Sequence, residues 1–209
     1  MTHCYLEVTD PMALLKIHGV IDIQGFYVGG KFIPRQLAII TRDTITKVYE
    51  FETGINPSKL TLDERKTVEY VQRHVNHLDL EPSPFSKLVY PSDDYDVALH
   101  RIELDYQITE DTLLAVNNNH AEELLTLVCF PFVSIRTIIT GLPNKEKLME
   151  FYTKGTVAFS TAGKVEALWK FIERLQSEVR AMNQEAVTLQ FPLGRSALNM
   201  KHVFPTLIE

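Results

Sequence analysis

A carboxylate inside an apolar stretch is the first residue of the chain that could do chemistry. Asp22 is the centre of the sequence VIDIQ at 20–24, in which the other residues carry no charge. A β-rich stretch of this kind predicts a strand in which Val20, Asp22 and Gln24 share one face. Burying a charge costs free energy unless the charge is paired, so a metal ion or a hydrogen-bond donor is expected beside Asp22. The alternative is a carboxylate that caps the turn at Gly25 or lies on an exposed face.

If Asp22 holds a metal ion, phosphoryl transfer is the chemistry that it indicates. In two-metal catalysis several carboxylates hold two divalent ions, which activate water and stabilise the leaving oxygen. Further carboxylates would have to reach Asp22 from elements that follow it in the chain.

Three strands are expected in the first quarter of the chain. Residues 17–24, 32–40 and 44–52 are rich in residues that favour strands. Gly29-Gly30 is a turn signal between the first two strands, and Arg42-Asp43 joins the second to the third. Strands with such short connections predict an antiparallel meander.

Helices and short apolar strands alternate in the rest of the chain. Thr61 and Glu64 form a capping box that predicts the start of a helix. Strands that are separated by helices add to a sheet in parallel. The order therefore predicts an α/β fold with a ribonuclease H-like mixed sheet, in which parallel strands extend the three-strand antiparallel meander and helices flank both. The later elements are expected, in order, as a helix at 93–106, a strand at 112–116, a helix at 120–128, a strand at 132–139, and helices near 144–151 and at 164–185.

Two short motifs carry a resemblance to a known family. The sequence DIQGF at 22–26 resembles the opening D-x-E motif of the DEDD (DnaQ-like) 3′–5′ exonucleases, with Gln24 in place of Glu. The sequence NHAE, which follows Asn118, resembles their second motif, N-x-x-F-D, with Asn118 kept and Glu122 in place of Asp. These two matches cover residues 16–140. A weaker match to the third motif, H-x-A-L-x-D, lies at 195–200.

The resemblance implies a site as well as a fold. It assigns catalysis to Asp22 and Glu122, a metal site to Asp22, Gln24 and Glu122, and contacts with substrate to Phe26 and Asn118. An active enzyme of this family would use Mg²⁺ or Mn²⁺.

The departures from the family's motifs predict that the site is degenerate. The amide of Gln24 is neutral, whereas a hard divalent ion prefers a charged oxygen. Glu122 reaches farther than Asp and would shift the ion. In the third motif Met200 cannot ligate Mg²⁺, and Arg195 is no general base because it stays protonated.

Three hypotheses of function follow. The first, which the altered motifs favour, is a catalytically degenerate exonuclease-like domain that acts as a binding or scaffold protein, with single-stranded nucleic acid or a protein as its partner. The segment DIQGF at 22–26 also resembles the start of uncharacterised open reading frames of arthropod genomes and mobile elements, which would imply a viral or mobile-element origin. The second is an active metal-dependent 3′–5′ exonuclease on single-stranded DNA or RNA, with its other ligands among Asp79, Asp94, Asp96 and Asp105. The third is an α/β interaction protein without nuclease ancestry.

Composition limits these hypotheses. The chain has 209 residues, a net charge of −6 and no run of Lys and Arg, which argues against non-specific binding to duplex nucleic acid. A single domain is expected, with its core at 16–186 and an extension at 187–209. Cys4 and Cys129 make no disulfide framework, and Cys129 is expected in the core. No stretch is apolar enough to span a membrane, and the protein is expected to be intracellular, cytoplasmic or nuclear.

Overall fold

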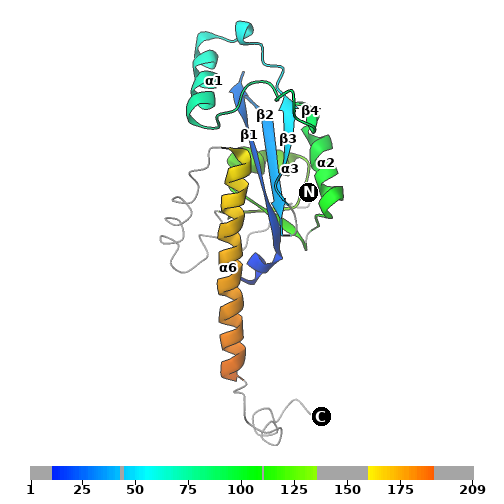
Figure 1. Ribbon diagram of the computed structural model, residues 1–209, viewed down its shortest axis with the longest axis vertical. Helices are drawn as coiled ribbons and strands as arrows, with labels where there is room; N and C mark the ends of the chain where they lie inside the picture. The colour runs from blue at the N-terminus through cyan, green and yellow to red at the C-terminus, as the bar shows by residue number, and fades with distance from the viewer. Residues whose placement is uncertain (1–10, 43–44, 110, 136–159, 191–209) are drawn as a thin grey trace, which may run out of the picture.

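The structure is a computed structural model that describes residues 11–42, 45–109, 111–135 and 160–190 (Figure 1). The strands are β1 (Ile17–Val28), β2 (Lys31–Thr41), β3 (Lys47–Glu52), β4 (Val89–Pro91), β5 (Leu113–Val116) and β6 (Phe132–Ser134). The helices are α1 (Leu62–His74), α2 (Tyr95–Tyr106), α3 (Asn119–Leu127) and α6 (Thr161–Gln190), with short 3-10 helices η1 (Pro11–Lys16) and η2 (Pro57–Lys59). None of the described helices is long and apolar enough to cross a bilayer.

The six described strands belong to one mixed sheet, in the order β4-β3-β2-β1-β5-β6. β1, β2 and β3 pair antiparallel, whereas β5 is parallel to β1 and β6 is parallel to β5. This is the predicted ribonuclease H-like sheet, a meander extended by parallel strands. β4, which the sequence did not reveal, adds a short parallel strand beside β3.

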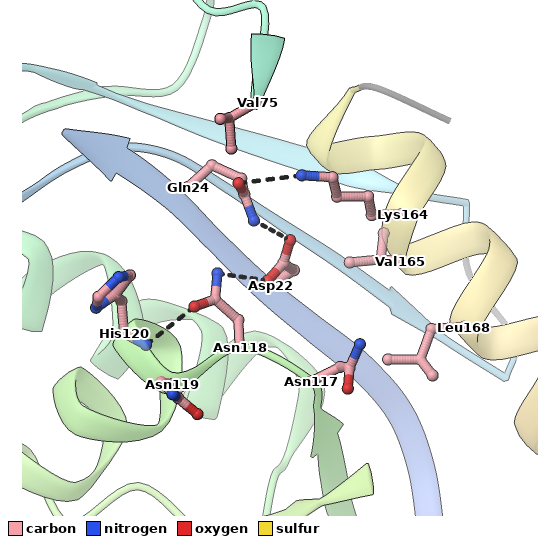
Figure 2. Close-up of a pocket in the computed structure, with 10 residues that line it drawn as sticks. All are labelled: Asp22, Gln24, Val75, Asn117, Asn118, Asn119, His120, Lys164, Val165 and Leu168. Atoms are coloured by element: carbon pink, nitrogen blue, oxygen red, sulfur yellow. Dashed lines mark hydrogen bonds between the residues drawn. The ribbon is translucent and has the colours of Figure 1, made fainter. Parts of the chain in front are cut away.

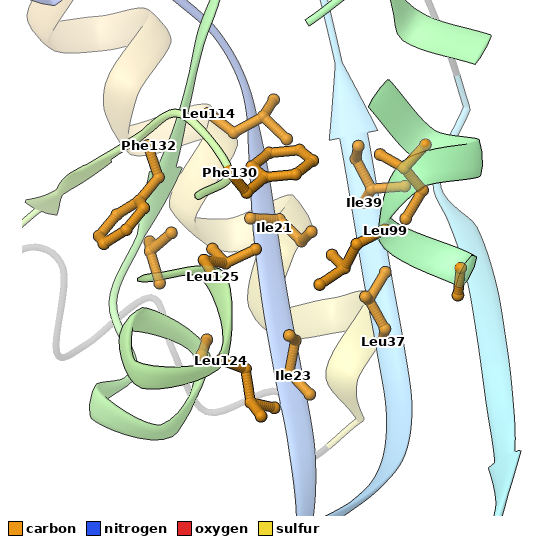
Figure 3. Packing of buried hydrophobic residues seen from close by; sticks show 14 of the residues in the cluster. Ile21, Ile23, Leu37, Ile39, Leu99, Leu114, Leu124, Leu125, Phe130 and Phe132 are labelled. Carbon is orange, nitrogen blue, oxygen red and sulfur yellow. The ribbon is translucent and has the colours of Figure 1, made fainter. Parts of the chain in front are cut away.

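Helices cover both faces of the sheet, and the alternation of side chains along β1 divides its residues between them. Val20 packs with Val165 and Leu168 of α6 on one face. Ile21 and Ile23 pack on the other face with residues of α2 and α3 (Figure 3). Each fully buried aliphatic or aromatic side chain contributes about 1.5–3 kcal/mol to folding, so the sheet is held from both sides.

The predicted turn and capping box are confirmed and are joined to each other. Gly29 and Gly30 both have positive φ, 59° and 75°, as a two-residue hairpin turn requires. The side chain of Thr61 accepts a hydrogen bond from the backbone of Glu64, and the Glu64 carboxylate accepts one from the backbone of Thr61. The other Glu64 oxygen accepts from Gly29 N at 2.9 Å, so α1 is tied to the β1–β2 turn.

Several boundaries differ from those expected. The first strand continues to Val28 because the hairpin with β2 runs past a register shift at Gln24/Gly25. The second helix begins at Tyr95, and the long helix spans Thr161–Gln190. The helix expected near 144–151, and the strand expected beyond residue 135, lie outside the described residues.

Cys129 is exposed, so its expected place in the core is wrong. It follows the last turn of α3 with φ 55°. Cys129 N donates to Thr126 O, and Phe130 N donates to Leu125 O, the pattern of a Schellman motif. This left-handed residue turns the chain so that Phe130, and not Cys129, is buried.

Candidate functional site

A cavity of about 520 Å³ lies beside Asp22, where β1 passes the end of β5 (Figure 2). Three parts of the chain supply its polar lining: β1, the β5–α3 junction and the first turn of α6. The polar residues of the lining are Asp22, Gln24, the asparagines at 117–119, His120 and Lys164.

The cavity exists because the two neighbouring strands differ in length. β5 ends at Val116, and its last pair with β1 is Val20↔Ala115. Beyond that point β1 has lost its neighbour, and backbone groups buried there need another partner. Asn118 Nδ2 donates to Ile23 O at 2.8 Å and so replaces a hydrogen bond of the sheet. Crevices at the carboxyl ends of parallel strands are common ligand sites in α/β folds.

Asp22 is buried, with 7% of its surface exposed, and it is not on an open face. Its Oδ2 accepts a hydrogen bond from Gln24 Nε2 at 2.6 Å, and its Oδ1 accepts one from Asn118 Nδ2 at 3.2 Å. Burial raises the pKa of the Asp22 carboxyl above its usual value, although these hydrogen bonds and the charge of Lys164 oppose the shift. Among the described residues, its direct side-chain partners are therefore neutral amides and not a second carboxylate.

Lys164 is the site residue that sequence reasoning missed. Its Nζ donates to Gln24 Oε1 at 3.1 Å, across 140 residues of sequence. Gln24 thus joins the ammonium of Lys164 to the carboxylate of Asp22 (Figure 2). Lys164 lies in the first turn of α6, after Ser160 Oγ accepts from Gly163 N at 3.0 Å. A cation is unfavourable at the start of a helix, and this misfit in the sequence was the available signal.

Asn118 holds the start of α3 against β1. Its Oδ1 accepts from His120 N at 2.9 Å, which caps the helix, while its Nδ2 serves Asp22 and Ile23. The resemblance assigned Asn118 to substrate, and in the structure all of these contacts are internal.

An aromatic group borders the cavity at His120. The His120 ring stacks on Phe32 with centroids 4.6 Å apart and planes at 18°. Tyr27, which is 41% exposed, lies 5.1 Å from the same ring. His120 is the member of this aromatic group (Tyr27, Phe32 and His120) that lines the cavity.

Two of the residues assigned by resemblance lie elsewhere. Phe26 shares the face of Asp22 and Gln24 on β1, but α1 covers it, and Phe26 is 1% exposed in a cluster with Ile55 and Val68. A ring so buried has no surface for substrate. Glu122 lies one helical turn beyond the cap of α3 and lines a different surface hollow, with Glu123 and Leu127. The structure therefore brings together Asp22, Gln24 and Asn118, but not Phe26 or Glu122.

The carboxylates proposed as relocated ligands do not line the cavity either. Asp105 pairs with Arg101 on α2, and the backbone of Asp79 binds Arg35. Within the described ranges, no three His, Cys, Asp or Glu side chains gather as a metal site would require. The third-motif residues at 195–200 lie outside those ranges.

The chain matches no family model and no curated protein. The resemblance to the DEDD exonucleases thus stays a prediction that rests on two short motifs, as does the origin in a virus or mobile element.

Proposed function

We propose that this chain is a catalytically degenerate, exonuclease-like domain that binds single-stranded nucleic acid without cutting it. The observation that carries the proposal is the charge balance of the cavity. Asp22 is the one carboxylate in the described lining, and Lys164 places a positive charge in the same lining. Two-metal phosphoryl transfer needs several carboxylates around its ions, and this donor set supplies one.

The cavity and its border favour contacts with bases over contacts with phosphates. A net charge of −6 without a basic run gives little attraction for a phosphate backbone. Proteins that recognise single strands stack the bases on aromatic side chains and meet their edges with polar groups. The aromatic group at His120 and the amide-rich lining beside it have this combination of properties.

Binding without metal is the first test of the proposal. Fluorescence anisotropy with labelled single-stranded DNA and RNA in EDTA is expected to show saturable binding by the full chain. His120→Ala should weaken that binding by about 1–3 kcal/mol, the value of one stacked base. Phe85→Ala removes an aromatic ring that is 90% exposed outside the cavity, and it should bind like the wild type. Failure of the wild type to bind either strand would overturn the choice of ligand and leave a protein partner.

Digestion tests the degenerate part of the proposal. End-labelled single-stranded DNA and RNA should keep their length when incubated with the chain and Mn²⁺. Shortening that Asp22→Ala abolishes would make the protein an active exonuclease. Asp111→Ala, which changes a carboxylate whose side chain is 90% exposed, distinguishes loss of this site from a general effect of losing charge.

A further inference from the structure

A divalent ion does not fit the donors that surround Asp22. Mg²⁺ binds oxygen ligands in near-octahedral geometry, usually through one or two carboxylates. Both oxygens of Asp22 already accept hydrogen bonds, from Gln24 and from Asn118. The Gln24 oxygen, the next potential ligand, accepts from Lys164. An incoming ion would have to break these contacts and lie beside an ammonium group.

We infer that the Lys164 ammonium supplies the positive charge of this cavity in place of a metal ion. It thereby prevents divalent ions from binding at Asp22. The inference rests on the proposed function in taking this cavity as the site, and it adds that the positive charge of the site is covalently attached to α6. Gln24 is the positioning residue of the pair, because its amide presents NH₂ to the carboxylate and oxygen to the ammonium.

The identity of residue 24 fits this arrangement better than the family's Glu would. An amide has both a donor and an acceptor, so Gln24 can satisfy Asp22 and Lys164 together. A glutamate at the same position would have no hydrogen to give Asp22, and it would place two carboxylates side by side. Gln24 and Lys164 are therefore a matched pair, one neutral and one cationic, across β1 and α6.

Lys164 lies at an electrostatically unfavourable position in α6. The positive end of the α6 dipole disfavours a cation in the first turn, and no acidic residue lies in that turn to compensate. Local helix stability thus does not explain the lysine, whereas the buried charge of Asp22 does. The charge of Lys164 acts on Asp22 to favour its ionised form.

Mn²⁺ binding by the full chain tests this inference, with free Mn²⁺ measured by electron paramagnetic resonance. Wild type is expected to show no saturable binding at Asp22. Lys164→Glu, which replaces the ammonium by a second carboxylate, should bind at least about ten-fold tighter, since the nearby charge has changed sign. Adding Asp22→Asn should abolish the gain. Lys170→Glu makes the same charge change at an exposed position of α6, and it should bind like the wild type.

Lys164→Met keeps the test decisive if Lys164→Glu does not fold, because it retains most of the side chain's aliphatic stem and adds no charge. Added Mn²⁺ should then broaden the amide resonances of Ile23 and Asn118 in this variant and leave them sharp in the wild type. Asp22-dependent Mn²⁺ binding by the wild type would overturn the inference, as would variants at 164 that bind no tighter than Lys170→Glu. Because these readouts need no nucleic acid, failure of the proposed function would appear separately, as digestion or as lost binding of single strands.

Discussion

Two carboxylates are buried to the same extent in this sheet, but they differ in how they contact a cation. Asp22 on β1 and Glu50 on β3 are each 7% exposed. Glu50 meets its cation directly, with Arg35 Nη1 3.3 Å away, and it accepts hydrogen bonds from Ser86 and from Gln36. Asp22 reaches its cation only through Gln24.

The difference shows in the pKa of each group. Burial opposes the ionisation of Glu50, but the hydrogen bond from Ser86 and the charge of Arg35 outweigh it, so the pKa of Glu50 lies below its usual value. For Asp22 burial prevails and raises the pKa. Glu50 is a structural charge with a direct cationic partner, whereas both oxygens of Asp22 accept hydrogen bonds from neutral amides beside a cavity. A buried group with a shifted pKa that lines a cavity is a candidate functional residue.

The Glu50 network also holds the segment between α1 and β4 against the sheet. Arg35 donates from Nε to Asp79 O at 2.7 Å and from Nη2 to Glu81 O at 2.6 Å. Ser83 N donates to Glu50 Oε2 at 3.3 Å. Arg35 lies at the register shift between β1 and β2, where Gly25 pairs with Pro34 and Arg35 has no partner in β1. This irregularity lets a charged side chain hold the segment between α1 and β4.

The largest expected effect is therefore at Arg35. Arg35→Met would leave the Glu50 carboxylate buried without its cation and should lower the free energy of unfolding by about 3–5 kcal/mol. Urea denaturation followed by circular dichroism measures the loss. Arg101→Met, which breaks an exposed pair with Asp105, should change stability by about 1 kcal/mol or less. Equal losses in the two variants would contradict a structural role for the Glu50 network.

The two carboxylates should make stability depend on pH in opposite directions. The folded pKa of Glu50 is lowered, so its stabilisation is present above the usual pKa of 4.5 and is lost as pH falls through the folded value. The folded pKa of Asp22 is raised, so stability is lost as pH rises from the usual 3.8 through the folded value. With rising pH, wild type should gain stability relative to Glu50→Gln and lose it relative to Asp22→Asn. Urea unfolding between pH 3 and pH 8 measures both differences in the free energy of unfolding. If the two differences changed with pH in the same direction, the opposite pKa shifts of Glu50 and Asp22 would be refuted.

The smallest effect on stability is expected at Lys164. Because Gln24 separates it from Asp22, Lys164→Met should lower the free energy of unfolding by about 1 kcal/mol or less, far below the loss at Arg35. Thermal unfolding of the two variants side by side measures the contrast. A loss at Lys164 as large as that at Arg35 would make the Asp22 site a structural ion pair like the Glu50 network.

Much of the fold could be predicted from the sequence because its signals are local. The period-two pattern around Asp22, the turn at Gly29-Gly30 and the capping box at Thr61 each act over a few residues. β4 left no such signal, since it has three residues and ends in Pro91.

The site was predictable only in part. Asp22 is conspicuous as a charge inside a strand, whereas Lys164 reaches it from 140 residues beyond Gln24. Motif matching placed Glu122 in the site, but a position one turn past the α3 cap lies outside the cavity. Phe26 continues the face of Asp22, and only the packing of α1 shows that this end of β1 is covered.

Anomalous diffraction from crystals of the wild-type chain soaked in Mn²⁺ tests the central claim most directly. We expect Lys164 Nζ to lie within hydrogen-bond distance of Gln24 Oε1, with no Mn²⁺ peak beside Asp22. A Mn²⁺ peak on Asp22, with Lys164 displaced from Gln24, would contradict it and restore a metal-dependent reading of this site.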